Sequence, residues 1–306
     1  MLIRNCRSRR GITLIETVVV AATVCLLVIL AIPAVQAEVE AARRTTCQDN
    51  LRQIGQAFQK HHEAYGAFPP CRTNRPAAHG FCVNLLPFID RNDLYEAWRF
   101  DKPFHDPENE PVARTAVSTF QCPTAPDQNR IVKLRQASLG PFYGTEGVAG
   151  DYFVTHGLNG GERGERQHPA LLTNERQPIS KITDGASCTT LVLEHAGHTD
   201  HYIRGVKQEN YNKSVHPGWW GAWTSFQSFT YQGYTADGTA NGKECSINCN
   251  NAQGIYSFHP KGANTLFCDG RVRFLADSVP VDVVLALASR DGGEILSVDD
   301  YGVVAE

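Results

Sequence analysis

The sequence predicts an α+β protein in which a long N-terminal helix packs on a C-terminal antiparallel β-sheet domain with long loops. Three observations predict this class. An uncharged apolar run extends from Thr17 to Ala37, an apolar stripe at helical spacing continues to Phe58, and short strand-like runs between Gly, Pro, Asn and Asp follow. The 306 residues suffice for a sizeable core, and the net charge of −3 argues against a nucleic-acid binder.

The apolar run is preceded by four arginines, Arg4, Arg7, Arg9 and Arg10. Positive charge beside a span keeps that end in the cytoplasm, so the body is expected on the far side of the membrane. The run of about 21 residues is long enough to cross a hydrocarbon core of roughly 30 Å as a helix. We therefore predict a single-pass protein of the cytoplasmic (inner) membrane with residues 12–36 as its span, or a cell-surface filament built from it.

Three processing routes suit such an N-terminus. Signal-peptide cleavage after Ala37 satisfies the small-residue rule, but it places Glu16 early in the apolar region, where a charge is unfavourable. A lipoprotein signal needs a small residue before Cys25, and Val24 stands there. Cleavage after Gly11 fits best, because the long apolar run follows this glycine instead of preceding it. Residues 1–11 are then a leader.

The run Gly11-Ile12-Thr13-Leu14-Ile15-Glu16 resembles the cleavage and methylation motif of type IV prepilins and type II secretion pseudopilins. The resemblance implies a pilin-like fold, cleavage after Gly11 by a prepilin peptidase and methyltransferase, and methylation of the new amine of Ile12. It also implies assembly with other pilin-like subunits. Phe usually follows the glycine in that family, so Ile12 is a departure, while Pro33 falls where many pilin helices are kinked.

Glu16 is a carboxylate in an apolar helix, where a charge is costly unless it is paired or reaches the headgroups. In a filament it is expected to pair with the Ile12 amine of a neighbouring subunit, since methylation keeps that amine charged. The alternative is that Glu16 only extends to the lipid headgroups.

The helix is expected to continue beyond the membrane. One apolar stripe recurs at steps of four, three and four residues: Cys47, Leu51, Ile54 and Phe58. Gly66 and the following prolines end the pattern. A continuous helix from Ile12 to Tyr65 would be roughly 80 Å long at 1.5 Å per residue. Residues 37–66 are therefore assigned to the extension of the helix and residues 67–306 to the outer body.

The outer body reads as a sheet interrupted by loops. The expected strands are 153–154, 190–193, 255–258, 265–268 and 271–275, and the expected helices are 92–99, 113–120 and 281–288. Residues 156–180 and 205–253 are polar, Gly-rich and irregular.

Ten cysteines, less Cys6 in the leader and Cys25 in the apolar run, leave eight in the rest of the chain. An even number in a chain directed to an oxidising compartment favours disulfides. Cys245 and Cys249 can close a small loop, but the overall pairing cannot be read from the sequence. Zinc binding is the competing interpretation, weakened because no second Cys pair has finger-like spacing.

Asp269-Gly270 lies between two runs with strand character, which predicts a hairpin with a type I′ turn. The alternative is that His259 and Asp269 pair for metal or acid–base chemistry. A His, nine residues and Asp-Gly also resemble the C-terminal signature of the DUF1559 family, a group of bacterial prepilin-like proteins. Further segments resemble that family's blocks in its order: 47–55, 67–70, 85–88, 120–123, 182–185 and 292–294. Cys188 and the insertion-like segment 205–253 depart from the family pattern.

The densest set of metal-ligand residue types lies in one short segment: Glu194, His195, His198, Asp200 and His201. A transition metal accepts such ligands, but a solvated polar loop is the favoured explanation, because such sets often lack the coordination geometry.

Two other groups are weaker candidates. The acidic tail residues Asp291, Asp299 and Asp300 offer oxygens for calcium, without EF-hand spacing. The aromatic residues between Trp219 and Tyr234 suit either a carbohydrate or peptide surface or the buried anchors of a long loop.

No nucleophile elbow, phosphate-binding loop or His-Glu-x-x-His helix occurs in the sequence. The chain is therefore expected not to be an enzyme, and no catalytic, cofactor or metal site is predicted. The predicted function is that of a pseudopilin-like structural subunit, assembling through its N-terminal helix in a type II secretion or type IV pilus-like system. The alternatives are a membrane-anchored module that binds a polysaccharide or protein through segment 205–253, and a cell-surface metal hydrolase built on His195, His198 and His259.

Overall fold

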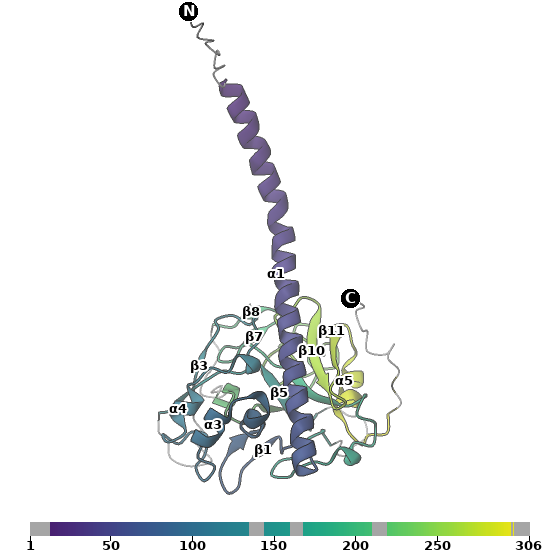
Figure 1. Cartoon of the computed structure of the whole chain (residues 1–306). Helices are drawn as coiled ribbons and strands as arrows, with labels where there is room; N and C mark the ends of the chain where they lie inside the picture. The colour runs from purple at the N-terminus through teal and green to yellow at the C-terminus, as the bar shows by residue number, and fades with distance from the viewer. Residues whose placement is uncertain (1–12, 135–143, 160–167, 210–218, 295, 297–306) are drawn as a thin grey trace, which may run out of the picture. The chain divides into compact units, whose positions relative to one another are not determined.

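The computed structural model describes residues 13–134, 144–159, 168–209, 219–294 and 296 (Figure 1). The chain divides into two compact units, residues 1–42 and 43–306. Helix α1 (Leu14–Tyr65) contains the boundary between them. The predicted helix, which continues well beyond the apolar run, is therefore confirmed from Leu14 to Tyr65.

The first half of α1 has the length and composition of a single membrane span or a signal anchor. Every Val, Leu and Ile side chain from Leu14 to Val39 is exposed. So much apolar surface is costly in water and matches the hydrocarbon core of a bilayer. Pro33 lies inside the helix, as the sequence suggested.

Thr13 and Glu16 form a capping box at the start of α1. The backbone N–H and the hydroxyl of Thr13 each donate to the Glu16 carboxylate at 2.8 Å. The Glu16 N–H in turn donates to Thr13 Oγ1 at 3.4 Å. Such a box satisfies N–H groups that have no partner within the helix. Glu16 therefore has a partner in its own chain, which the sequence-based interpretation did not include.

The second half of α1 carries the predicted apolar stripe. Four side chains, which we call the α1 stripe, are 0% exposed: Cys47, Leu51, Ile54 and Phe58. The Phe58 ring stacks on Phe81, with centroids 5.7 Å apart. The helix ends where Gly66 takes a φ of 73° and its N–H donates to the His62 carbonyl at 2.7 Å. A glycine in the left-handed region is a common end of a helix.

The central sheet has five strands in the order β11-β10-β6-β5-β9. Their bounds are β5 Tyr152–Leu158, β6 Thr190–Glu194, β9 Ser228–Tyr231, β10 Gly262–Phe267 and β11 Val272–Ala276. The α+β class is confirmed. The sheet is mixed and not antiparallel throughout, because β9 runs parallel to β5. A parallel pair needs a long connection, and the chain between these two strands supplies it.

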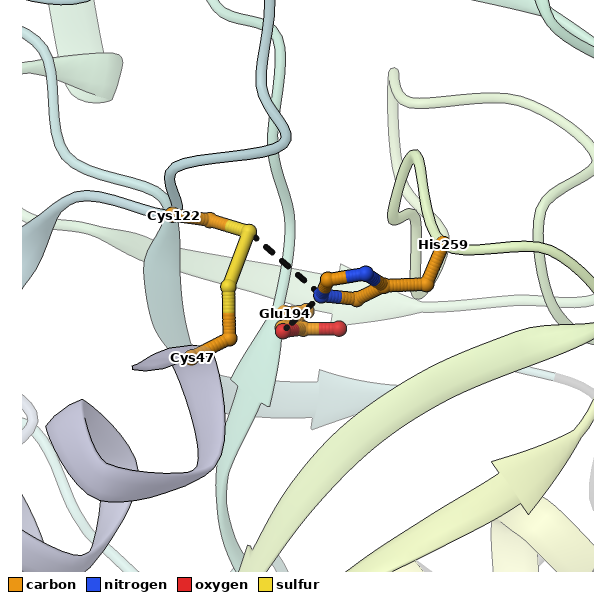
Figure 2. Close-up of side chains that lie close together, drawn as sticks. All are labelled: Cys47, Cys122, Glu194 and His259. Atoms are coloured by element: carbon orange, nitrogen blue, oxygen red, sulfur yellow. Dashed lines mark hydrogen bonds and ion pairs between the residues drawn. A yellow bond between two sulfur atoms is a disulfide. The ribbon is translucent and has the colours of Figure 1, made fainter. Parts of the chain in front are cut away.

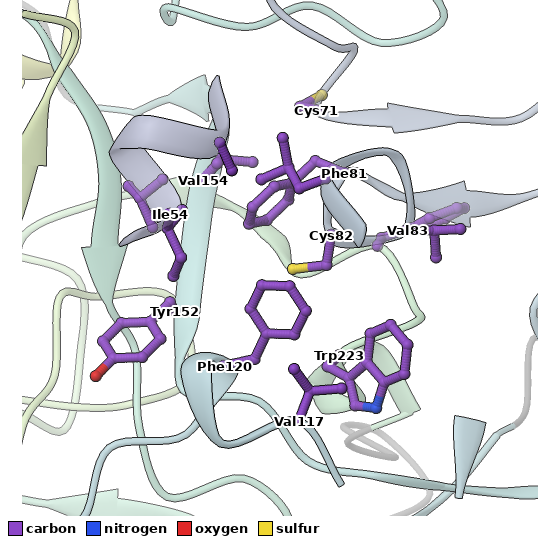
Figure 3. Close-up of a cluster of buried hydrophobic side chains, with 14 of the residues drawn as sticks. Ile54, Cys71, Phe81, Cys82, Val83, Val117, Phe120, Tyr152, Val154 and Trp223 are labelled. Carbon is purple, nitrogen blue, oxygen red and sulfur yellow. The ribbon is translucent and has the colours of Figure 1, made fainter. Parts of the chain in front are cut away.

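Each face of the sheet packs against a different helix. Tyr152, Val192 and Leu266 belong to the cluster that contains the α1 stripe. Their strand neighbours Phe153, Leu193 and Phe267 belong to a second cluster with the residues of α5 (Val281–Ala288). The alternation follows from the two-residue period of a strand. Figure 3 shows the first cluster, where Ile54 and Tyr152 lie with aromatic side chains from several segments.

Short elements and loops surround the sheet. They are β1 Arg72–Thr73, β2 His79–Gly80, α2 Phe81–Leu85, α3 Asn92–Ala97, α4 Glu110–Ala113, β3 Ile131–Lys133, β4 Glu146–Val148, β7 Tyr202–Ile203 and β8 Val206–Lys207. The described residues also contain four 3₁₀ turns: η1 Leu86–Ile89, η2 Ser118–Phe120, η3 Ile179–Lys181 and η4 Trp219–Gly221.

Two predicted elements are wrong. The helix expected over 113–120 is absent, because Val117 is extended and only the turn η2 follows it. The strand expected over 255–258 is replaced by isolated bridges at Ile255 and Tyr256. The Ser257 N–H donates to the Asn248 side chain at 2.7 Å instead of to a neighbouring strand. The helices expected over 92–99 and 281–288 are confirmed as α3 and α5.

The β10–β11 hairpin is confirmed, but its turn differs from the predicted type I′. Gly270 has a φ of 85°, whereas Asp269 is not among the residues with positive φ. The Gly270 N–H donates to the Phe267 carbonyl at 2.9 Å, and the Phe267 N–H donates to the Arg271 carbonyl at 2.9 Å. This is a three-residue loop, in which only the last position needs the left-handed region. Asp269 Oδ1 accepts the Arg271 N–H at 2.9 Å and holds the loop.

The α1 helix approaches this hairpin closely at Gly55. A Cβ at that position would lie 2.9 Å from a terminal carbon of Leu266. One turn further on, Gln59 donates to the Cys268 carbonyl at 3.0 Å. The helix and the Asp-Gly loop are therefore packed as one unit.

Substitution of Gly270 tests the geometry of the loop. Gly270→Ala should lower the free energy of unfolding by about 1–2 kcal/mol, because an L side chain is strained at positive φ. Gly270→Asn should cost less, since Asn tolerates the left-handed region. Thermal unfolding of the full chain in detergent, followed by circular dichroism, measures both. Equal melting temperatures for wild type and Gly270→Ala would contradict the loop described.

Candidate functional site

Four buried side chains from distant parts of the chain meet beside the sheet (Figure 2). Cys47 comes from α1, Cys122 follows η2, Glu194 ends β6, and His259 lies in the loop before β10. The exposed fraction is 2% for His259 and 0% for the other three. One nitrogen, oxygen or sulfur atom of each lies within 4.8 Å of the others. We call this group the Cys–Glu–His cluster.

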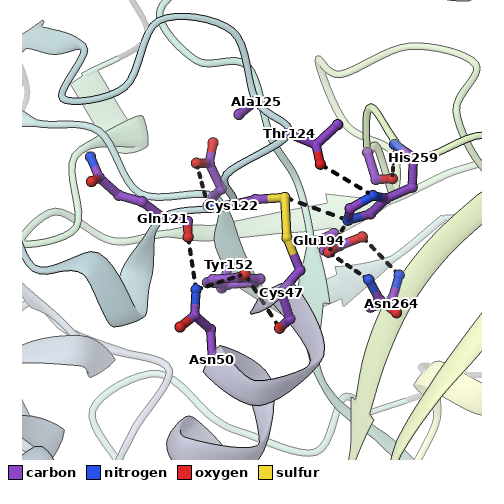
Figure 4. The surroundings of a disulfide bond; sticks show 12 residues. Cys47, Asn50, Gln121, Cys122, Thr124, Ala125, Tyr152, Glu194, His259 and Asn264 are labelled. Atoms are coloured by element: carbon purple, nitrogen blue, oxygen red, sulfur yellow. Dashed lines mark hydrogen bonds and ion pairs between the residues drawn. A yellow bond between two sulfur atoms is a disulfide. The ribbon is translucent and has the colours of Figure 1, made fainter. Parts of the chain in front are cut away.

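The disulfide Cys47–Cys122 ties α1 to the loop after η2, with Cα atoms 5.4 Å apart (Figure 4). Asn50, one turn along the helix, donates from Nδ2 to the Gln121 carbonyl at 2.9 Å. Cys245 and Cys249 form a second disulfide, as their spacing suggested. The preference for disulfides is thus confirmed at these two pairs.

Glu194 is a carboxylate with no exposure to solvent, which is costly unless it is hydrogen-bonded. Asn264 on the neighbouring strand β10 donates twice, from its backbone N–H at 2.7 Å and from Nδ2 at 3.0 Å. His259 Nε2 lies 3.3 Å from Glu194 Oε1. Two donors of Asn264 therefore hold this carboxylate in place, and the His259 imidazole lies beside it.

His259 is held by the loop that precedes β10. Its N–H donates to Ser257 Oγ at 3.0 Å. Its imidazole lies between two partners: Nε2 is 3.6 Å from Cys122 Sγ, and Nδ1 is 3.4 Å from Thr124 Oγ1. Asp269 lies instead in the hairpin loop. The two ends of the His-x9-Asp-Gly signature thus have separate roles, a buried imidazole and a turn.

A pocket of about 470 Å³ opens beside His259. Its lining includes charged and polar side chains: Arg204, Glu244, Asn248, Tyr256, His259 and Asp277. Two of them, Glu244 and Asn248, come from segment 205–253, which the sequence predicts as a candidate binding segment. The pocket suits a small polar ligand better than an apolar one.

A second buried charge lies behind Cys122. The Asp151 carboxylate accepts the Cys122 N–H at 3.0 Å and the Gly197 N–H at 3.3 Å, and it forms an ion pair with Arg130. Both side chains of the pair are almost fully buried. This network holds the backbone at Cys122 in place.

The sequence favours a solvated polar loop for segment 194–201, and this is wrong for three buried residues: Glu194, His195 and His198. The geometry of β6 separates the side chains of this segment. Successive strand residues point to opposite faces. Glu194 faces α1, whereas the His195 ring stacks on Phe229 at 4.4 Å on the other side. His201 Nε2 lies 2.8 Å from Asn250 Oδ1. In the described parts of the chain, the group of ligand atoms close enough for one metal ion includes neither His195, His198 nor His201.

His195 and His198 are buried among aromatic rings. The His198 ring lies 4.3 Å from Trp220, and His195 Nδ1 contacts the Gly254 carbonyl. Burial lowers the pKa of His195 to about 3 and lowers the pKa of His198 well below its ordinary value. Both rings are therefore neutral parts of the core near neutral pH.

The aromatic stretch after residue 219 is mostly core. Five of its side chains are at most 4% exposed: Trp223, Phe226, Phe229, Tyr231 and Tyr234. They are the buried anchors of a long loop, and the alternative of an aromatic binding surface is wrong for these five.

The remaining candidates lie at the two ends of the chain. Asp291 accepts from His168, whose Nδ1 is 2.9 Å away. Asp299, Asp300, Gly11 and Ile12 lie outside the described residues.

A comparison with protein-family models matches residues 36–282 to a family described as "Protein of unknown function (DUF1559)". The chain belongs to the DUF1559 family. Searches of curated proteins and of solved structures found no match.

In this DUF1559 protein, three segments that resemble family blocks converge on one site. Segment 47–55 supplies Cys47, segment 120–123 supplies Cys122, and the His-x9-Asp-Gly signature supplies His259. Sequence reasoning missed the pairing of these residues and the role of Glu194. The sequence did contain one indication of this pairing, since Cys47 and Cys122 both lie within segments that resemble family blocks.

Removal of the two disulfides should have unequal effects. The Cys47–Cys122 bond closes a separation of 75 residues and the Cys245–Cys249 bond one of 4 residues. Loop-closure entropy predicts a loss of about 4 kcal/mol for Cys47→Ala with Cys122→Ala, against about 2 kcal/mol for the matched pair Cys245→Ala with Cys249→Ala. Denaturant unfolding of both double variants measures the difference, and equal losses would contradict this reasoning.

Acid should destabilise the protein through the buried histidines. The unfolded chain binds a proton on each histidine below about pH 6.5, whereas folded His195 does so only near pH 3, so stability falls across that window. At pH 5, His195 alone should account for a loss of about 2 kcal/mol. Unfolding midpoints of wild type and His195→Phe between pH 7.5 and 5 check this. A variant with the same pH slope as wild type would refute it.

Proposed function

We propose that this DUF1559 protein is a prepilin-like, membrane-anchored structural subunit that assembles through α1. The observation that carries the proposal is the continuity of one helix. Its first half is apolar and exposed and begins within the Gly11–Glu16 motif, and its second half buries the α1 stripe. One helix that contains both the membrane span and a buried part of the body supports this proposal. The span would pack against the spans of other copies, while the body faces outward.

The proposal assigns processing and partners. A prepilin peptidase and methyltransferase cleaves after Gly11 and methylates Ile12, and the mature subunit lies in the cytoplasmic membrane with its N-terminus on the cytoplasmic side. Other pilin-like subunits and the lipid bilayer are its partners. No chemical reaction is assigned to the protein.

Glu16 has two successive roles in this proposal. In the isolated chain its carboxylate caps Thr13. Thr13 becomes the second residue after cleavage, so Glu16 stands four positions after the new N-terminal residue Ile12 in the sequence. In an assembly, the same carboxylate accepts the amine of a neighbouring subunit, since an unpaired charge is costly in lipid.

The second candidate function is a membrane-anchored binding module without a filament. The polar pocket beside His259 favours it, because it offers both signs of charge from Arg204, Glu244 and Asp277. A filament subunit sediments with its own copies, whereas a binding module remains a detergent-soluble monomer. Sedimentation therefore separates the two candidates.

Mass spectrometry of the mature N-terminus tests the proposal. In a host with a prepilin peptidase, the chain should begin at a methylated Ile12. Gly11→Leu should leave the leader attached, because the peptidase of the resembled family acts after this glycine. The matched control Ala37→Leu should be processed like wild type. A mature N-terminus at Glu38 would refute the membrane-anchored subunit.

The same preparations distinguish processing from assembly. Glu16→Gln keeps the side-chain size and removes the charge, so it should be cleaved but no longer sediment with other subunits. Glu38→Gln, which lies at the end of the apolar run, serves as its control. Unchanged sedimentation of Glu16→Gln would remove the assembly role.

A further inference from the structure

The Cys–Glu–His cluster has the composition of a metal site. We propose that, when Cys47 and Cys122 are reduced, the cluster binds one zinc ion through both sulfurs, His259 Nε2 and Glu194. The inference does not depend on the proposed function, because all four residues lie within the compact unit formed by residues 43–306.

The distances between the candidate ligands suit a tetrahedral ion. His259 Nε2 lies 3.6 Å from Cys122 Sγ and 3.3 Å from Glu194 Oε1. Ordinary zinc–ligand bonds at tetrahedral angles place nitrogen about 3.6 Å from sulfur and about 3.4 Å from oxygen. Two edges of the coordination tetrahedron are therefore already formed. The two sulfurs must separate from a bonded pair to about 3.8 Å, which requires reduction of the disulfide.

The residues around the ligands also suit a metal. A metal-bound carboxylate is usually hydrogen-bonded on its far side, and a metal-bound histidine usually has a partner at its other nitrogen. Asn264 provides two hydrogen bonds to Glu194, at 2.7 and 3.0 Å. Thr124 Oγ1 lies 3.4 Å from His259 Nδ1. The carboxylate and the ring are thus oriented before any ion arrives.

The chemistry of the ligands selects zinc over hard cations. Two thiolates, an imidazole and a carboxylate suit a tetrahedral, borderline-soft ion, whereas calcium and magnesium prefer oxygen alone. Two thiolates and one carboxylate against a doubly charged ion leave a net charge of about −1, the same as a Cys₃His zinc site. All four ligands are buried, as in a closed structural site.

A pocket borders the cluster at His259. His259 belongs to the cluster and also lines the pocket of about 470 Å³. The carboxylates of Glu244 and Asp277 line the same pocket and attract a cation.

The two states of the cluster are related by a balanced redox step. A dithiol reductant gives two electrons and two protons to the Cys47–Cys122 bond, which breaks to two thiols, and the reductant becomes a disulfide. Each thiol then loses a proton as its sulfur binds zinc. A catalyst that carries its own disulfide reverses the change. Its disulfide takes up the two electrons from the two thiolates and two protons from solvent and becomes a dithiol, while the Cys47–Cys122 bond reforms and the ion is released. The same four segments are held together in both states.

Metal binding by the full chain in detergent tests the proposal. The reduced wild-type protein, freed of metal by a chelator, should take up about one zinc per chain, and the oxidised protein none. Cobalt should replace zinc and give the absorption of a tetrahedral thiolate complex. This spectrum needs no substitution, and circular dichroism of the same sample shows whether the reduced protein stays folded. Reduced protein that keeps its circular dichroism but gives no such spectrum overturns the proposal.

Variants locate the site. His259→Ala and Cys47→Ser with Cys122→Ser should abolish the cobalt spectrum, and Asn264→Ala should weaken zinc binding about 10–100-fold, as expected for a residue that orients a ligand. The control Cys245→Ser with Cys249→Ser should bind like wild type, since that pair belongs to no such group in the described residues. Binding that survives His259→Ala, or that is lost in the control, assigns the metal elsewhere and overturns the proposal.

Discussion

The burial of the α1 stripe against one face of the sheet is the contact on which the rest of the structure depends. Leu51, Ile54 and Phe58 are 0% exposed, and burying each contributes roughly 1.5–3 kcal/mol. Gly55 lets the helix approach Leu266, which sets the position of the helix along the β10–β11 hairpin. That position brings Cys47 beside Cys122. The disulfide then secures a contact that apolar packing has already made.

The two-residue period of the strands decides which side chains join the cluster. Glu194 and Asn264 face α1, so they meet Cys47 and His259 within a region closed to water. His195 is one residue further and stacks on Phe229 on the other face. Neighbours in the sequence are thus separated by the sheet, while residues about 140 positions apart, Cys122 and His259, touch. The buried Glu194 carboxylate is stabilised there by two hydrogen bonds from Asn264 and by the adjacent His259 imidazole.

Features with a local cause were predictable from the sequence. The four-three-four spacing of the α1 stripe and the Asp-Gly dipeptide each express one element's own geometry. The stripe and the hairpin are confirmed, whereas the predicted type I′ turn is wrong, because only Gly270 of the pair has a positive φ. Pairing across the fold was not predictable, because nothing local links Cys47 to Cys122 or Glu194 to His259. The same limit applies to β9, whose parallel partner β5 lies far back in the sequence, and to the aromatic stretch, since apolar rings suit a core and a binding surface equally well.

The capping box of Thr13 and Glu16 favours one processing route over another, because only cleavage before Thr13 retains it. Cleavage after Ala37 would remove Thr13 and Glu16 and would leave the α1 stripe unchanged, so the packing of the body does not distinguish the routes. Cleavage after Gly11 keeps the box at the second residue of the mature chain, where the first N–H groups of the helix need acceptors. Glu16 then stabilises the start of the helix in the mature chain, even without a neighbouring subunit. A carboxylate early in the apolar run is unfavourable in a signal peptide. In a helix that is retained after cleavage, the same carboxylate caps the first turn.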